Sequence, residues 1–141
     1  VYGPIHDVMG SVVALVDPAT QEIVERYEYT AFGEETIYNS IGAKEEHSLI
    51  GNPWRFAEKR LDEKSGLISF GFRFYDPSVG RWTATDPAGR IDGPNLYAYL
   101  HNDPLNSFDR FGLASIPNSS EPFFHYFYGN VEKHCFCETH R

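Results

Sequence analysis

The sequence predicts an all-β fold of successive hairpins, with at most one or two short helices. The 141 residues include 16% aromatic side chains, and these favour half-buried, pleated surfaces over helix faces. The 12 Gly and 9 Pro are spread along the chain, where they separate short segments. A turn signature, Asp followed by Gly three or four residues later, recurs at 7–10, 76–80, 86–89 and 109–112. Because Asp side chains accept hydrogen bonds from nearby amides and Gly adopts positive φ, each is predicted to close a turn.

Short β-patterned runs lie between these turns, at 11–16, 23–30 and 67–75. In the last run the even positions from Ile68 to Phe74 are all apolar. A period of two predicts a continuous apolar face, with Arg73 on the opposite face of the strand. The alternative for Arg73 is an edge-strand side chain in solvent.

Two further segments lack a clear strand pattern. Residues 34–50 are polar and poor in turn signals, and we interpret them as a loop. Residues 95–100 follow Pro94 and precede a second Pro, at 104, which favours a short helix.

The net charge of −8 argues against a nucleic acid or an anionic membrane surface as partner, because no basic stripe is present. No segment approaches the roughly 18 consecutive apolar residues needed to span a bilayer. Cys135 and Cys137 lie within the last seven residues and supply no disulfide framework for the core. With His134 and His140 they are off the usual zinc spacing, so we predict no metal and no cofactor.

Arg73, Asp86 and Asp109 are candidates for a peptide-hydrolysing site. Two carboxylates that share a proton can activate water against a carbonyl, and an arginine keeps its partner carboxylate ionised. Asp109 precedes the bond between Leu113 and Ala114 by four residues, and Gly112 would let the chain fold back to present the Leu113 carbonyl. Asp86 would then hold the shared proton and protonate the leaving amine.

The same residues also allow alternative chemistry or no chemistry at all. Ala114 offers no hydroxyl or thiol for an acyl shift, so water must be the nucleophile. In the alternative interpretation, Asp86 and Asp109 form turns and have no catalytic role. Some self-cleaving modules cut Asp-Pro bonds, but the four such bonds here, after residues 17, 76, 86 and 103, are also ordinary turn sequences.

The motifs of this region resemble the RHS repeat-associated core domain of YD-repeat proteins. This class occurs in bacterial polymorphic toxins, in toxin-complex C subunits and, more distantly, in animal teneurins. The resemblance covers most of residues 1–113. It is carried by residues 66–67, 70–77, 80–82, 85–87, 93–99, 102–104 and 109–113.

The resemblance implies a fold, a site and partners. The sheet would curl into a shell around the protein's own C-terminal tail, with 1–50 as YD-repeat hairpins and loop, 51–113 as the core with the self-cleavage motif, and 114–141 as a variable tail. It implies that Arg73, Asp86 and Asp109 form an aspartyl-protease-like site that acts once. Many relatives carry Pro after the last Asp, whereas here Arg110 follows it, which leaves that turn less rigid.

The resemblance also implies a secreted or cell-surface bacterial protein. Since the chain begins at Val1 within a repeat pattern, we expect a segment of a longer protein, whose export signal would lie upstream. The tail would be its cargo and the upstream YD-repeat shell its partner. The alternative function is a structural or adhesive shell piece without chemistry.

Overall fold

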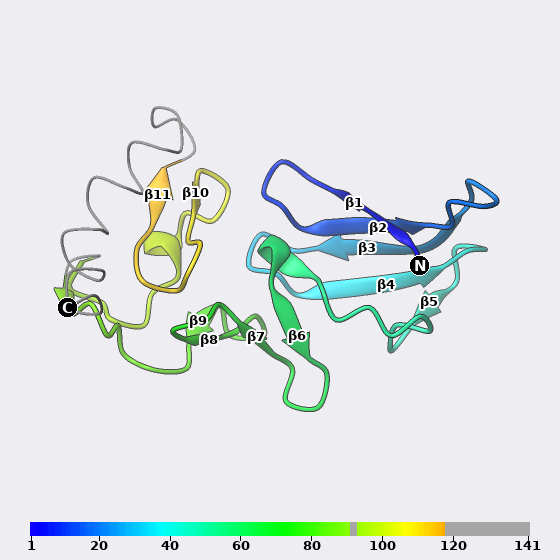
Figure 1. Cartoon of the computed structure of the whole chain (residues 1–141). Coiled ribbons are helices and arrows are strands. Elements are labelled where there is room, and N and C mark those ends of the chain that lie inside the picture. The colour runs from blue at the N-terminus through cyan, green and yellow to red at the C-terminus, as the bar shows by residue number, and fades with distance from the viewer. Residues whose placement is uncertain (91–92, 118–141) are drawn as a thin grey trace, which may run out of the picture.

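The computed structural model describes residues 1–90 and 93–117, which fold into antiparallel β-structure without an α-helix in these ranges (Figure 1). The first sheet has five strands in chain order: β1 (Gly3–His6), β2 (Val12–Val16), β3 (Ile23–Tyr29), β4 (Glu35–Asn39) and β5 (Lys44–Glu45). The second has four: β6 (Arg60–Asp62), β7 (Leu67–Ser69), β8 (Phe74–Asp76) and β9 (Arg81–Trp82). A short pair joins β10 (Ser107–Phe108) to β11 (Ile116–Pro117). The prediction of an all-β fold of hairpins is confirmed.

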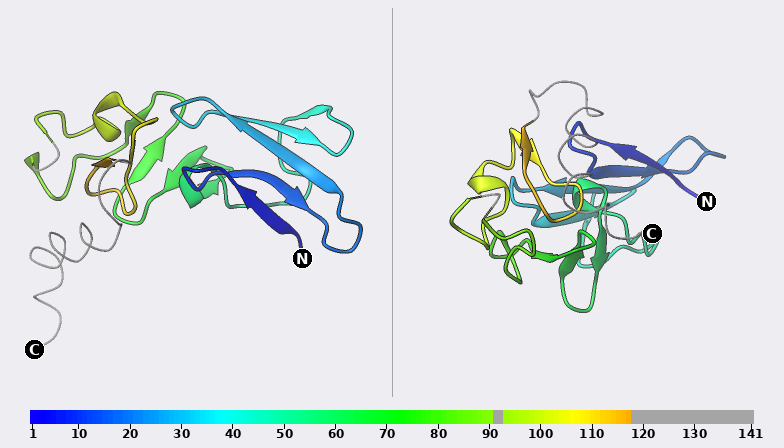
Figure 2. Two further views of the ribbon diagram at one scale, coloured as in Figure 1. Left: turned by 90° about the horizontal axis from the view of Figure 1, so that it is seen from above. Right: turned by 60° about the vertical axis from the view of Figure 1, so that its left-hand side comes forward.

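Figures 1 and 2 show the five-stranded sheet at one end of the molecule and β7–β11 gathered at the other. The described residues include two single 3-10 turns, η1 (Phe56–Glu58) and η3 (Leu100–Asn102). Both contain backbone with positive φ. No helix in the described ranges has the length and apolar character required to cross a bilayer.

The four Asp-to-Gly turns form as predicted, and they do so through the Asp side chains. Asp7 accepts a hydrogen bond from the amide of Met9 at 2.9 Å, and Asp76 accepts one from the amide of Ser78 at 2.9 Å. The turns that begin at residues 86 and 109 use the same bond and belong to the candidate site described below. Local chemistry therefore decides where the hairpins reverse.

The loop expected over 34–50 is wrong in part, because this segment contains β4 and β5. Ile37 of β4 is 3% exposed and pairs with Tyr27 of β3. Pairing with a strand that already has a buried face supplies the order that the polar local sequence does not show.

The strand expected over 67–75 is also wrong as a single element, because the backbone turns at 70–73. Gly71 has a φ of +103° there, which interrupts the extended chain and restarts the alternation of side chains. The expected apolar face is therefore split: Ile68 and Phe70 are buried, whereas Phe72 and Phe74 are exposed. Arg73 is 4% exposed, so it is not an edge-strand side chain in solvent.

The short helix expected over 95–100 is replaced by a turn followed by η3. The three residues of η3 have φ values between +50° and +61°, on the left-handed side. Leu100 and the preceding Tyr99 are nevertheless each 2% exposed. Burial of these two side chains holds a backbone that the sequence alone does not favour.

Two apolar clusters stabilise the described residues. The first sheet packs Val12, Leu15, Tyr27 and Ile37 together. The larger cluster is mainly aromatic and contains Phe56, Ile68, Phe70, Tyr75, Trp82, Tyr99 and Leu100. Most of its ring pairs meet edge to face or tilted, and the centroids of Tyr75 and Tyr99 lie 4.3 Å apart. This aromatic cluster joins β7–β9 to η3 and lies directly beneath the candidate site.

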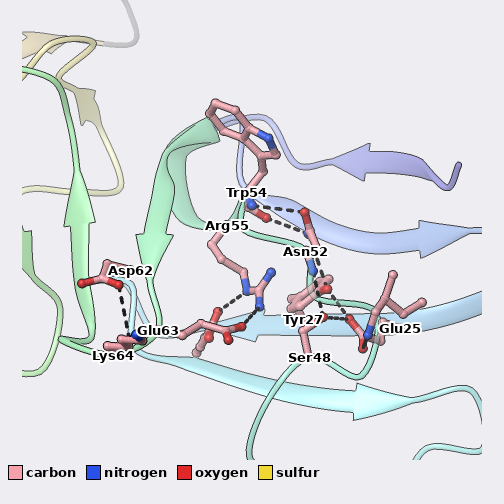
Figure 3. A network of polar contacts seen from close by, with 11 residues as sticks. Glu25, Tyr27, Ser48, Asn52, Trp54, Arg55, Asp62, Glu63 and Lys64 are labelled. Carbon is pink, nitrogen blue, oxygen red and sulfur yellow. Dashed lines mark hydrogen bonds and ion pairs between the residues drawn. The ribbon is translucent and has the colours of Figure 1, made fainter.

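A buried polar network attaches the segment between β5 and β6 to the first sheet (Figure 3). Glu25, which is fully buried, accepts hydrogen bonds from the hydroxyls of Tyr27 and Ser48 and from the amide of Ile50. The Arg55 guanidinium lies over the Tyr27 ring. It forms two ion pairs, from Nε to Oε2 of Glu35 at 3.1 Å and from Nη2 to Oε1 of Glu63 at 3.2 Å. The network thus connects β3 and β4 to the β6–β7 turn and fixes the orientation of the second sheet.

Candidate functional site

Arg73 brings together two aspartates from different turns. Its Nη2 atom lies 3.0 Å from Oδ2 of Asp86 and 3.7 Å from Oδ2 of Asp109. The side chains of all three residues are between 2% and 3% exposed. The two Oδ2 atoms therefore lie on one guanidinium nitrogen, in an interior where charge interactions are weakly screened.

The rest of the guanidinium is fixed by backbone and by an aromatic ring. Nε donates to the Gly112 carbonyl oxygen at 2.5 Å, and Nη1 donates to the Leu96 carbonyl oxygen at 3.4 Å. The guanidinium carbon lies 4.1 Å from the centre of the Trp82 ring, a cation–π contact. Arg73 therefore has a single orientation, set from four directions.

Asp109 closes the turn that precedes the predicted cleavage point. Its Oδ1 atom accepts hydrogen bonds from three successive amides, those of Phe111 at 3.1 Å, Gly112 at 2.8 Å and Leu113 at 3.2 Å. Oδ2 is thereby left facing Arg73. Burial raises the pKa of the Asp109 carboxyl, and it outweighs the three amides and the Arg73 charge, which act in the opposite direction.

Asp86 occupies the equivalent position in its own turn. Oδ1 accepts from the amide of Ala88 at 2.8 Å, and the Asp86 carbonyl accepts from the amide of Gly89 at 3.0 Å. As in Asp109, one oxygen holds the turn and the second, Oδ2, meets Arg73. In both aspartates, therefore, Oδ1 accepts hydrogen bonds from the amides of the turn and Oδ2 faces Arg73.

Gly112 is needed where the two turns meet. Its φ of +76° is left-handed, and a Cβ there would lie 3.2 Å from the Phe70 Cβ and 3.3 Å from the Arg73 amide nitrogen. The Phe111 carbonyl, one residue earlier, accepts from the amide of Phe72 at 3.2 Å. The chain before the predicted cleavage point is thus docked against the 70–73 turn, with Leu113 and Ala114 half-buried directly after it.

A pocket of about 570 Å³ opens beside Asp109. It is lined by Val8, Met9, Gly10, Ala57, Glu58, Lys59, Phe108, Asp109 and Arg110. These residues come from the β1–β2 turn, from η1 and Lys59 directly after it, from β10 and from the turn at 109–112. Asp109, which is only 5% exposed, thus lies at the wall of this pocket.

The structure brings together Arg73, Asp86, Asp109 and Gly112, which were all singled out from the sequence. Sequence reasoning gave no role to Trp82 or to the Leu96 carbonyl, although both lie in motifs that carry the family resemblance. Trp82 could have been noticed as a ring two residues from the β8–β9 turn, but its contact with Arg73 depends on the fold. The cysteines and histidines considered as metal ligands, at 134–140, lie outside the described residues.

No family model matches the chain. Among curated proteins it is 34% identical over 95 residues to toxin subunit YenC1 of Yersinia entomophaga, a match covering 67% of this chain and 9% of that protein. It is 36% identical over 109 residues to double-stranded DNA deaminase toxin A of Burkholderia cenocepacia, covering 77% of this chain and 7% of that protein. The chain therefore spans less than a tenth of the length of these two relatives.

Solved structures agree with these matches. The crystal structure of a complex of TcdB2, TccC3 and Cdc42 superimposes with a TM-score of 0.68 and 31% identity, over 79% of this chain and 5% of that chain. A Photorhabdus luminescens Tc holotoxin pore gives a TM-score of 0.68 and 29% identity over 86% of this chain and 5% of that chain. The chain belongs to the RHS-repeat toxin proteins, within the RHS repeat-associated core.

Proposed function

We propose that this chain is the shell-plug segment of an RHS toxin and that it cuts itself once, between Leu113 and Ala114, to free a C-terminal effector. One observation carries the proposal: two buried aspartates from separate turns share one arginine nitrogen, and the turn of the second aspartate ends at the bond to be cut. Burying two carboxylates is costly, and here both meet one arginine directly before the bond to be cut, which favours a chemical role for the pair.

The geometry supports a division of labour that reverses the one expected from sequence. We assign the role of general acid to Asp109, because its Oδ2 lies farther from Arg73, at 3.7 Å, and burial raises the pKa of its carboxyl. Asp86, whose Oδ2 lies 3.0 Å from Arg73, is assigned the role of the base that takes a proton from the attacking water. The hydroxide adds to the Leu113 carbonyl carbon, the C–N bond to Ala114 breaks, and the proton of Asp109 passes to the leaving amine.

Arg73 and the Asp109 turn hold the chain for this attack. The Gly112 carbonyl is held by Arg73 and the Leu113 amide by Asp109, so the carbonyl that follows has little freedom. Such fixation of a reacting group can supply about 7–11 kcal/mol of the barrier reduction in well-oriented systems. The reaction consumes its own substrate, so the site would act once per chain.

The relatives suggest what the tail is for. Two of them are named as a toxin subunit and a DNA deaminase toxin, and one solved neighbour is a Tc holotoxin pore. We assign residues 1–50 to the shell hairpins, 51–113 to the plug with its site, and 114–141 to the start of the variable cargo. The upstream shell would enclose that cargo, and the protein would work outside the bacterial cell or at its surface.

Substitution of each aspartate by asparagine tests the proposal. Asn is nearly isosteric but cannot exchange a proton, so Asp86→Asn and Asp109→Asn should leave one band on a denaturing gel where the wild type gives two. Asp103→Asn is the matched control, because Asp103 precedes Pro104 and is exposed. If scission persists in both site variants, the alternative of a structural or adhesive shell piece without chemistry becomes the better account.

A further inference from the structure

The segment after the predicted cut is also attached to the fold. β11, residues Ile116–Pro117, pairs antiparallel with β10, residues Ser107–Phe108. One residue closer to the bond, the Ser115 Oγ atom lies 2.9 Å from Nδ1 of His101. The contacts described so far for Arg73 and Asp109 hold only the chain before the bond.

His101 is held on a firm base. It is the middle residue of η3, whose first residue, Leu100, is buried in the aromatic cluster together with Tyr99. Backbone hydrogen bonds close the turn on both sides, from the Asn102 amide to the Tyr99 carbonyl at 2.9 Å and from the Asp103 amide to the Leu100 carbonyl at 2.8 Å. A left-handed turn anchored in this way presents the imidazole in a defined position toward the departing chain.

We propose that His101 and β10 form a clamp on residues 115–117 and that His101 is a positioning residue for cleavage. This inference rests on the proposed function, since it concerns the same bond. The Asp109 turn and Arg73 fix the chain up to the Leu113 amide, and the clamp fixes it from Ser115 onward. Two peptide groups, those that join Leu113 to Ala114 and Ala114 to Ser115, lie between the two anchors, so the clamp helps to set how the target carbonyl is turned toward the dyad.

The clamp would also select for the first residues of the cargo. It recognises the first residues of the tail as a short strand that begins with a hydroxyl-bearing residue, through Ser115 and the pairing of Ile116 with Phe108. Because the pairing lies beyond the bond, scission does not break it. Directly after scission, the freed tail would therefore still be paired with β10.

The test uses substitutions that suit the left-handed backbone of His101, whose φ is +53°. His101→Gly removes the imidazole without backbone strain, and His101→Asn keeps a polar group near the position of Nδ1 in a residue that tolerates positive φ. We expect His101→Gly and Ser115→Ala to slow scission about tenfold or more, in line with the sensitivity of reactions to misplacement of the target. His101→Asn and Ser115→Thr should restore a rate near that of the wild type.

Ser65→Ala, a hydroxyl removal in the exposed β6–β7 turn, is the control and should cleave normally. The double variant His101→Gly with Ser115→Ala should be no slower than either single one, because both remove the same contact. Equal rates in wild type, His101→Gly and Ser115→Ala would overturn the clamp while leaving the dyad intact.

A second readout does not depend on cleavage. In the Asp109→Asn background, amide hydrogen exchange at residues 107–108 and 116 reports the β10–β11 pairing directly. His101→Gly should accelerate exchange there and leave β2 and β3 unchanged. Unchanged exchange at β10 and β11 would refute the clamp, whether or not scission occurs in any variant. Failure of the wild type to cut itself would count against the proposed function and would leave the exchange test of the clamp unaffected.

Discussion

The Nε atom of Arg73 donates a hydrogen bond to the carbonyl oxygen of Gly112, 39 residues later in the chain, across 2.5 Å. The same guanidinium meets both aspartates of the candidate dyad. Arg73 therefore connects the proposed catalytic groups to the peptide unit that directly precedes the proposed cut. A planar guanidinium can make these contacts at the same time, whereas a simple positive charge cannot.

Replacing Arg73 by lysine should slow scission although the charge is kept. Lysine cannot contact two carboxylates, a carbonyl and the Trp82 ring with one planar group, so the orientation of the dyad is lost. Arg73→Ala should slow scission further and leave Asp86 and Asp109 without a counter-charge, which shifts residual cleavage to higher pH. The cleaved fraction is measured against pH for the three proteins. Superimposable profiles would reduce Arg73 to a structural residue.

Gly112→Ala should prevent scission by displacing the turn. Alanine at a left-handed φ costs about 1–2 kcal/mol, and the new Cβ would also press on Phe70 and Arg73 at 3.2–3.4 Å. Gly66→Ala is the control, since its φ of +72° imposes similar strain but no atom lies within 4 Å of the new Cβ. Thermal unfolding and gel analysis of both variants separate backbone strain from the collision. Equal cleavage in the two would contradict a role for Gly112 in presenting the bond.

Asp109 should make stability depend on pH in a defined direction. Its pKa is raised in the folded chain, so its favourable contribution is complete below the unfolded value of about 3.9 and is lost as pH rises through the folded pKa. Asp109→Asn abolishes this titration. The unfolding temperature of Asp109→Asn should therefore rise relative to that of an Asp86→Asn reference, also uncleaved, as pH increases from the acidic range to neutrality. A difference independent of pH would show that the pKa of Asp109 is not raised.

The Glu25 network should matter for stability and not for scission. Glu25→Gln places an amide group among the hydroxyls of Tyr27 and Ser48 and the amide of Ile50, and one buried polar contact is lost. We expect a loss of about 1–3 kcal/mol in the free energy of unfolding. Glu28→Gln, exposed on the same strand, should cost little. Denaturant titration measures the free energy of unfolding of both variants. A Glu25→Gln protein as stable as the wild type would contradict the importance of the network.

Features with local causes were predictable from the sequence, and those with distant causes were not. The four Asp-to-Gly turns follow from side chains that bond amides two or three residues away. The break at Gly71 was missed because alternating apolar residues on either side of it suggest one strand, whereas the chain reverses there to pair β7 with β8. The hairpin in 34–50 was missed because its order comes from pairing with β3.

The sequence predicted which residues form the candidate site, but not how they contact one another. Arg73, Asp86 and Asp109 came from the chemistry of paired carboxylates together with a family resemblance. Their meeting on one nitrogen, the stacking of Trp82 and the hold on the Gly112 carbonyl all depend on segments up to 39 residues apart. The assignment of Asp109 as the general acid rests on its longer distance from Arg73 and on the raised pKa that burial gives its carboxyl, and no local pattern encodes either.

The mass and the first residues of the released tail test the central claim most directly. Intact-mass measurement and N-terminal sequencing of the wild type should give a tail that begins Ala-Ser-Ile-Pro at Ala114, and a single uncut mass for Asp109→Asn. A tail that begins at Leu113 would mean that the carbonyl held by Arg73, that of Gly112, is the one attacked. A tail that begins at a proline after an aspartate, or a cut that survives in Asp109→Asn, would contradict the account.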